Sequence, residues 1–246
     1  MTKKSWIIVV ALTVAILGGM VWISKQNKTN VDDVDITKIQ AASSRSGNIA
    51  DHVYGKADSK IVLIEYGDYQ CPGCASAAPV IKQVVEKYKD KIAFVFRHKP
   101  LTSIHPNALA AAASAEAAGL QGKFWEMHDA LYENQDTWKN LSGEERTKYF
   151  LTLAKSVGVK EDLFKKDIDE GQVREKIDFD TSLASKANIT GTPAIFLNGK
   201  SVDKKFVGDK IVPDDEKDAR YVWSDATAFE NLILIPALKE AGIATE

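Results

Sequence analysis

The Cys71-Pro-Gly-Cys74 motif constrains the fold of this chain more than any other feature, because of what flanks it. Before it, residues 61–66 read Ile-Val-Leu-Ile-Glu-Tyr, an apolar, β-branched run typical of a strand buried on both faces. After it, apolar residues recur at helical spacing over residues 74–89. A second apolar run at 92–96 then predicts a parallel strand–helix–strand unit with the cysteines at the start of the helix.

This placement favours dithiol–disulfide exchange. The thiolate is the nucleophile in that chemistry, and the unpaired N–H groups at a helix N-terminus stabilise it. Pro72 suits the first helical position, whose N–H has no intrahelical partner. We therefore predict that Cys71 attacks and that Cys74, one turn further on, resolves the mixed disulfide. The chain has only these two cysteines, so we expect the disulfide itself to be the redox group, without a cofactor or a metal.

Two other roles for the cysteine pair are weaker. A structural disulfide across so short a loop would remove little entropy from the unfolded chain. A zinc site needs a second pair of ligands, and His98 and His105 lack the spacing of a zinc motif. The motif therefore favours redox chemistry over both.

Glu65 lies inside the apolar strand, six residues before Cys71. A buried carboxyl group there would have a raised pKa and could pass protons to or from Cys74. The alternative is a glutamate at an exposed strand edge. Pro193 precedes a short apolar run at 194–197, where proline is allowed at the start of a strand. The frequency of cis X–Pro bonds alone favours a trans bond at that position.

The rest of the folded part divides into further segments. Residues 106–187 are predicted to form a mainly helical insertion between two β halves. Asn198-Gly199 is a strong hairpin signal. The charged stretch 203–225 is interpreted as a loop or insertion, and 226–241 as a closing helix. The acidic residues of that stretch favour a solvated loop over a calcium site; they are Asp214, Asp215, Glu216 and Asp218.

The N-terminus predicts a membrane anchor. From Trp6 to Ile23 the chain has 18 residues without a charge, which at about 1.5 Å per residue nearly cross a bilayer core of about 30 Å. We expect an uncleaved signal anchor at 1–24, a polar tether at 25–47 and a folded domain at 48–246; a cleaved signal peptide is the alternative. Lysines flank the anchor almost equally, so its orientation is inferred from function: a dithiol oxidant suits an oxidising compartment.

Together these motifs resemble the DsbA-like branch of the thioredoxin superfamily, and the membrane-anchored bacterial BdbD type most of all. The likeness includes the strand that carries Glu65, the Cys71–Cys74 motif, the helical block, Thr192-Pro193, and the stretches at 96–101, 105–108 and 124–128. It implies an α/β thioredoxin-like fold with an inserted helical domain.

The resemblance also implies roles for residues near the cysteines. Pro193 would be cis and face Cys71, and the backbone of Thr192 would pair with the substrate chain. Pro72 and Gly73 would lie at the same substrate site and tune the stability of the thiolate. Glu65 matches the buried acid of the family.

The function implied is that of an extracytoplasmic thiol–disulfide oxidoreductase, single-pass in a bacterial cell membrane. It would donate its disulfide to reduced secreted or membrane proteins and be reoxidised by a quinone-linked membrane protein of the DsbB or VKOR type. A reductase or isomerase on the same fold is the second reading, because the motif lacks the histidine of the enteric oxidant. A non-enzymatic, membrane-tethered binding module is the third. The net charge of −2 gives no reason to expect nucleic acid as a partner.

Overall fold

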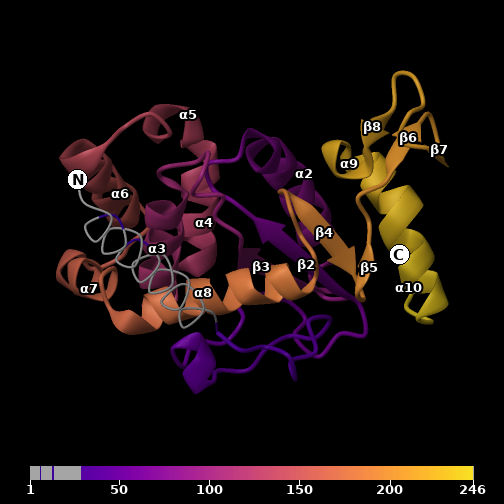
Figure 1. Cartoon of the computed structure of the whole chain (residues 1–246). Helices are drawn as coiled ribbons and strands as arrows, with labels where there is room; N and C mark the ends of the chain where they lie inside the picture. Colours follow the sequence, from indigo (N-terminus) through magenta and orange to yellow (C-terminus); the bar gives the residue numbers. More distant parts are fainter. Residues whose placement is uncertain (1–5, 7–12, 14–28, 246) are drawn as a thin grey trace.

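The computed structural model describes Trp6, Thr13 and residues 29–245. Its centre is a five-stranded sheet with the strand order β1-β3-β2-β4-β5 (Figure 1). β2 and β3 are parallel, and the other neighbouring pairs are antiparallel. The strands are β1 (Val53–Gly55), β2 (Val62–Gly67), β3 (Ala93–His98), β4 (Ala194–Leu197) and β5 (Lys200–Ser201).

Helices flank both faces of the sheet and fill the space beside it (Figure 1). They are α2 (Pro72–Tyr88), α3 (Ala108–Gly119), α4 (Phe124–Glu133), α5 (Gln135–Trp138), α6 (Gly143–Ser156), α7 (Glu161–Asp167), α8 (Gly171–Lys186), α9 (Ala226–Phe229) and α10 (Ile235–Glu240). A π-helical turn, Glu230–Leu234, joins α9 to α10, so the expected closing helix is present but contains a wider turn.

The alternation of side chains along β2 decides which of them meets which helix. Leu63 packs in one cluster with α2 and the C-terminal helices, whereas Ile64 and Tyr66 pack with α8 on the other face. Because successive side chains of a strand point to opposite faces, Glu65 shares the face of Leu63 and lies toward α2. The strand is buried on both faces, as its apolar sequence predicted.

The turn between β4 and β5 is the two-residue Asn198-Gly199 connection. Both residues have positive φ, 49° and 78°, as a type I′ hairpin turn requires. The side chain of Asn198 also accepts a hydrogen bond from the backbone N–H of Val62 at 2.8 Å, which links the turn to the start of β2. The predicted hairpin is confirmed.

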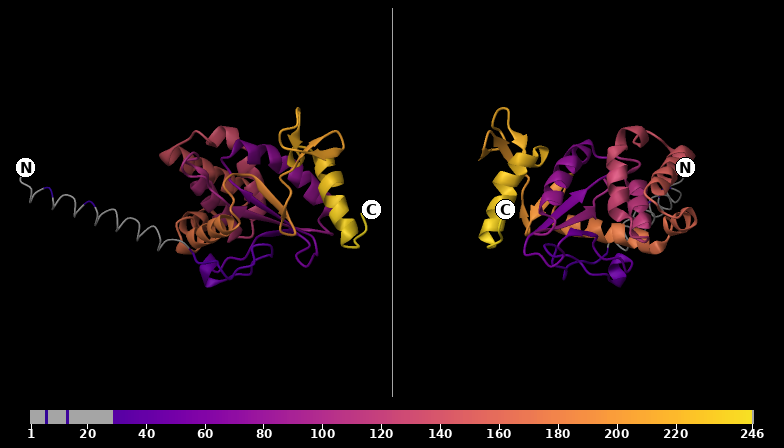
Figure 2. Two further views of the ribbon diagram at one scale, coloured as in Figure 1. Left: turned by 45° about the vertical axis from the view of Figure 1, so that its right-hand side comes forward. Right: turned by 180° about the vertical axis from the view of Figure 1, so that it is seen from behind.

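Helices α3 to α8 form one block between β3 and β4 in the chain (Figures 1 and 2). The block has its own apolar core, in which Met127, Trp138 and Phe150 are almost completely buried. Both cysteines contact this core, while the rest of α2 packs on the sheet. The expected α/β fold with a helical insertion is therefore present, and α2 lies between its two cores.

Residues 203–225, expected to be a loop or an insertion, contain a small second sheet with the order β7-β6-β8. Its strands are β6 (Lys205–Val207), β7 (Lys210–Val212) and β8 (Arg220–Tyr221). Phe206 and Val222 are buried and join the core formed by α2, α9 and α10, which attaches this sheet to the domain (Figure 1). The acidic residues 214–218 are exposed, as a solvated loop requires.

The N-terminal part also differs from expectation. Residues 29–47 lie on the domain instead of forming a free tether. Val31 and Val34 are buried against α8, and the ammonium group of Lys186 donates to the carbonyl oxygens of Val31, Asp32 and Val34 at 2.7–3.0 Å. The polar composition concealed these widely spaced apolar anchors. The predicted membrane anchor at 1–24 lies outside the described residues, apart from Trp6 and Thr13. In the part of the chain that the structure describes, no helix is long and apolar enough to cross a membrane.

A buried ion network fastens this N-terminal region to the sheet and to α8. The carboxylate of Asp51 lies 2.8 Å from the Arg97 guanidinium and 3.1 Å from the Lys176 ammonium. Lys176 also lies 2.6 Å from Asp180. All four side chains are at most 1% exposed. Arg97 completes its bonding by donating to the carbonyl oxygen of Ile36 at 2.8 Å and to that of Lys38 at 2.6 Å.

We expect the Asp51→Ala variant to lose about 3–5 kcal/mol of unfolding free energy, because it leaves two buried cations without this carboxylate. Urea unfolding, followed by fluorescence, measures the loss. Asp178→Ala is the control, because it breaks an exposed ion pair with Arg174 on α8 and should cost less than about 1 kcal/mol. Equal losses in the two variants would contradict a stabilising role for the network.

Candidate active site

The two cysteines lie at the N-terminal end of α2 in different surroundings. Cys71 is the N-cap residue, with extended backbone angles, and Pro72 is the first helical residue. Cys71 is 8% exposed, whereas Cys74 is completely buried. Both are free thiols. The structure thus brings the predicted pair together, with the predicted nucleophile nearer the surface.

The surroundings of Cys71 favour its thiolate. Its pKa is lowered to about 5, first by a hydrogen bond with the Cys74 thiol, then by the Thr192 side chain and the backbone N–H groups of Gly73 and Cys74. Partial burial opposes this shift but is outweighed. The N–H groups are unpaired because the helix begins there, so the local fold supplies the donors.

Cys74 is shifted in the opposite direction. Burial raises its pKa well above the usual value, and the hydrogen bond with Cys71 and the negative charge of Glu65 add to the shift. At neutral pH the reduced pair therefore consists of a Cys71 thiolate and a neutral Cys74 thiol.

The loop before β4 faces the reactive sulfur. The Thr192–Pro193 peptide bond is cis, as the resemblance implied and against the base rate. The Sγ atom of Cys71 lies 3.3 Å from the carbonyl oxygen of Thr192, to which the protonated thiol can donate. A Cβ atom on Gly73 would lie 3.3 Å from Cδ of Pro193, so a glycine at this position lets the loop approach the helix closely.

Glu65 is buried, with 1% of its surface exposed. Its pKa is raised to about 8, mainly by burial and then by the negative charges of Asp203 and Cys71. Its Oε1 atom has no hydrogen-bond partner among the described residues. The predicted buried acid is confirmed, and the exposed-edge alternative is excluded.

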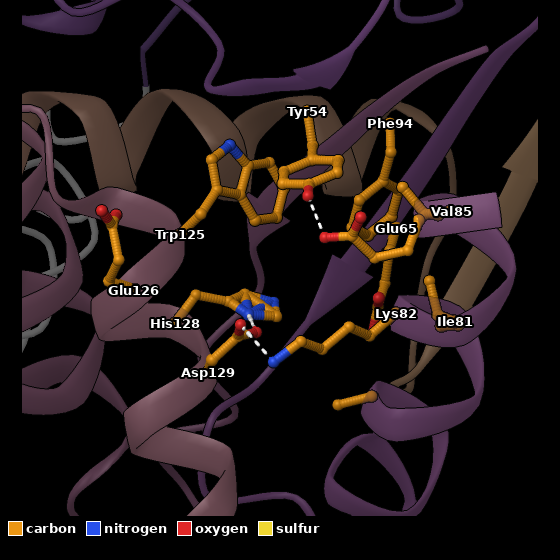
Figure 3. Close-up of a pocket in the computed structure, with 12 residues that line it drawn as sticks. Tyr54, Glu65, Ile81, Lys82, Val85, Phe94, Trp125, Glu126, His128 and Asp129 are labelled. Carbon is orange, nitrogen blue, oxygen red and sulfur yellow. Dashed lines mark hydrogen bonds and ion pairs between the residues drawn. The ribbon is translucent and has the colours of Figure 1, made fainter. Parts of the chain in front are cut away.

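Glu65 also faces a cavity of about 430 Å³ between α2 and α4 (Figure 3). On the opposite wall lie Trp125 and His128, both from α4. Burial lowers the pKa of His128 to about 3, so its ring is neutral. Lys82 and Asp129 form an ion pair of 2.7 Å in the lining. The acid therefore adjoins space that water can occupy.

Several polar side chains that the sequence did not single out hold the active-site segment. The amide of Gln135 donates to the carbonyl oxygens of Tyr69 and Cys71, at 2.7 and 3.0 Å. The carboxylate of Asp68 pairs with His105 at 2.8 Å and accepts the N–H of Leu101 at the same distance. These contacts join segments that are 33 to 66 residues apart, and no local pattern reveals them. The one local sign was the position of Asp68 directly after a buried strand, where the turn toward the cysteines begins.

A cluster of possible metal ligands lies in the core. His98, Glu116 and Asp180 each offer one ligand atom within 4.8 Å of the others. Glu116 already binds His98 at 2.8 Å and His52 at 2.9 Å, and Asp180 binds Lys176. Despite its burial, Glu116 has a pKa held well below its usual range by His52 and His98. The charges of this cluster are thus matched by protein groups.

Two kinds of relative match the sequence. A family model described as thioredoxin matches residues 47–211. The Na⁺/H⁺ antiporter NhaA 1 of Salinispora arenicola is 34% identical over 181 residues, which cover 68% of this chain and 26% of the antiporter. The chain thus spans about a quarter of the length of that relative. A probable disulfide bond formation protein D of Bacillus cereus is 29% identical over 169 residues, covering 66% of this chain and 76% of that protein.

A solved structure agrees with the second relative. α-DsbA1 of Wolbachia pipientis is 27% identical, with a TM-score of 0.55 over 74% of this chain and 88% of that one. Together with the family model, these matches confirm the resemblance to the DsbA-like branch that the sequence motifs indicated.

We expect Cys71 to be alkylated by iodoacetamide with a midpoint near pH 5, because the thiolate is the reactive form. Cys74 should stay unmodified in the folded protein, which peptide mass spectrometry can check. A midpoint near the ordinary cysteine value of about 8.5 would contradict the stabilised thiolate.

The raised pKa of Glu65 predicts a pH-dependent stability. Between its usual pKa of 4.5 and about 8, the carboxyl group ionises in the unfolded chain but stays protonated in the fold, so stability falls as the pH rises through this window. Relative to wild type, Glu65→Gln should therefore gain several kcal/mol from pH 5 to pH 8.

Urea unfolding of the disulfide form at these pH values measures that gain, because the cysteines do not titrate in this form. Glu126→Gln is the matched control: Glu126 lines the same cavity, but its hydrogen bond with Lys123 lowers its pKa. A pH-independent difference between Glu65→Gln and wild type would show that the carboxyl group ionises normally in the fold.

Proposed function

We propose that the chain, which belongs to the thioredoxin family, is a protein thiol–disulfide oxidoreductase that donates the Cys71–Cys74 disulfide to reduced proteins. The observation that carries this proposal is the stabilised thiolate of Cys71, next to a buried Cys74 and a cis proline. Thiol–disulfide exchange also accounts for the position of the only two cysteines at a helix N-terminus.

The stabilised thiolate favours donation of the disulfide over reduction. Interactions that stabilise the Cys71 thiolate lower the free energy of the reduced form, while the uncharged disulfide gains little from them. The reduced form is then favoured, and the disulfide becomes an oxidant. A thiolate of low pKa is also a good leaving group, which speeds its release from a mixed disulfide.

The exchange proceeds in two displacements. A client thiolate attacks Sγ of Cys71, the Cys71–Cys74 bond breaks, and Cys74 departs with the electron pair. A second client thiolate then attacks the client sulfur of the mixed disulfide, and Cys71 departs as a thiolate. The client loses two electrons and two thiol protons. One proton ends on Cys74, the other goes to solvent, and Cys71 remains ionised at neutral pH.

Glu65 supplies the proton that Cys74 takes up. With a pKa of about 8, it is protonated at neutral pH, and its charge is one of the causes of the raised pKa of Cys74. Once it has given up its proton, the carboxylate can regain one through the cavity that it lines. Glu65→Gln would slow the exchange steps and flatten their dependence on pH.

We further propose that the reaction takes place outside the cytoplasm, with the uncharged segment from Trp6 to Ile23 as a single membrane anchor. The clients would be reduced secreted or membrane proteins. Regeneration of the disulfide would require an oxidant, for which a quinone-linked membrane protein of the DsbB or VKOR type is our proposal. The name of the Bacillus cereus relative, a probable disulfide bond formation protein, supports disulfide formation as the reaction.

A reductase or isomerase is the second candidate. The specific observation in its favour is the Pro-Gly pair between the cysteines, which places no positive side chain beside the thiolate. In that case the dithiol would attack substrate disulfides, and electrons would flow in the opposite direction. The third candidate, a membrane-tethered binding module, requires that function survive replacement of both cysteines by serine.

The reduction potential decides the direction. We expect purified full-length protein, equilibrated with glutathione, to show a potential above that of the glutathione couple. The Thr192→Val variant should be more reducing and should have a higher Cys71 pKa, because the Thr192 side chain helps to lower that pKa. Thr190→Val, an exposed change in the same loop, is the control.

A potential near or below that of thioredoxin, about −270 mV, would move the assignment to a reductase. Failure to form any reversible disulfide would exclude redox chemistry altogether.

A further inference from the structure

A second pocket opens beside the reactive sulfur, on the side of the cis proline. Its volume is about 510 Å³. Its lining includes Gly73, Thr192, Pro193, Asp203, Tyr221 and Trp223. The cis-proline loop supplies one wall, and the segment that contains the small second sheet supplies the other.

The pocket lies within reach of a client chain attached to Cys71. A Cβ atom on Gly73, which lines the pocket, would lie 3.7 Å from Sγ of Cys71. A client cysteine joined to that sulfur therefore starts at the rim of the pocket. An extended chain advances about 3.3 Å per residue, so the pocket is in reach of client residues one or two positions from the cysteine.

Asp203 is the single charged residue in the lining of this pocket. Its carboxylate accepts long hydrogen bonds, 3.3 and 3.4 Å from the N–H of Ile195 and 3.4 Å from the Ser201 hydroxyl. Within residues 29–245, no lysine, arginine or histidine forms an ion pair with it. A half-buried carboxylate without a cation favours a positively charged ligand.

Two aromatic rings line the same pocket as this carboxylate. Tyr221 and Trp223 are stacked, with ring centroids 4.8 Å apart and an angle of 9° between the ring planes. Tyr221 is 40% exposed, while the indole N–H of Trp223 is buried and has no hydrogen-bond partner among the described residues. Lys205 already lies over the Tyr221 ring, 5.3 Å from its centroid, so this aromatic contact belongs to a cation of the chain itself, and the Asp203 carboxylate is the group left to pair with a client cation.

We propose that Asp203, Tyr221 and Trp223 form a cation subsite that binds an arginine or lysine side chain one or two residues from the client cysteine. The carboxylate would pair with the positive group and the aromatic rings would contact its flat or apolar part. Arginine fits best, because its guanidinium can both stack and form paired hydrogen bonds. This inference rests on the proposed function, since it names the clients of the same site.

The subsite would also link recognition to proton transfer. The negative charge of Asp203 is one of the causes of the raised pKa of Glu65. A client cation bound to Asp203 would offset that charge and lower the pKa of Glu65. Occupation of the subsite would thereby make Glu65 a readier proton donor to the departing Cys74 thiolate.

The test compares two cysteine peptides that differ only in arginine or glutamine two residues from the cysteine. With the disulfide form of the full-length protein, we expect the arginine peptide to react about tenfold faster at low salt, and the ratio to shrink as salt is added. Asp203→Asn should bring the ratio close to one. Asp209→Asn, which removes an exposed acid of the same segment, should leave the ratio unchanged.

Equal rates for the two peptides with wild type would overturn the proposal. So would a ratio that persists in Asp203→Asn, or one that falls equally in both variants, because the latter indicates only a general negative field. A loss of folding in Asp203→Asn would be detected by its urea unfolding curve, and Tyr221→Leu then serves as the second variant with the same expected loss of preference.

A binding experiment separates this inference from the proposed function. Versions of the two peptides with serine in place of cysteine cannot exchange disulfides. The indole N–H signal of Trp223 in NMR spectra, assigned with Trp223→Phe, should shift with the arginine peptide and much less with the glutamine peptide. If no peptide exchanges a disulfide but this selective shift occurs, the oxidoreductase assignment fails and the subsite stands. Absence of the shift together with normal exchange overturns the subsite alone.

Discussion

The negative charge on Cys71 at the start of α2 is the interaction on which the rest of the site depends. Two thiols three positions apart would titrate alike in water. The fold separates them by placing one where helix N–H groups are unpaired and the other in the core between the sheet and the helical block. The difference between the two thiols arises from the position of α2, because the helix begins at the surface and enters the core within its first turn.

Glu65 connects the two sides of this arrangement. It lies on the α2 face of β2, adjoins the cavity toward α4, and responds to the charge of Asp203 near the cis-proline loop. A buried acid with an unpaired oxygen costs folding free energy. The chain bears that cost next to the buried thiol, where a proton has to be held and released. Stability and chemistry thus oppose each other at one side chain.

Local sequence patterns were sufficient for the central features and insufficient for those built from distant segments. The apolar run that contains Glu65 and the motif at Cys71 are neighbours in the chain, so strand, turn and helix start could be predicted from them. Asp51, Arg97 and Lys176 meet across up to 125 residues, and no spacing rule relates them. Val31 and Val34 were concealed by polar neighbours. Gly208-Asp209, between the short runs of β6 and β7, is a hairpin signal from which the small sheet could have been predicted.

The docking of residues 29–47 changes the reach that a membrane-bound form of this protein would have. A chain that was free over 25–47 could extend by up to about 80 Å. The reactive sulfur could then reach client proteins far from the membrane. Because the segment is fastened to α8 and to Arg97 from residue 31 onward, an anchor ending at residue 24 would leave only a few residues, about 20 Å when extended. The distance between the domain and the bilayer would then vary little. Its encounters would be confined to polypeptides within a thin layer at the membrane surface.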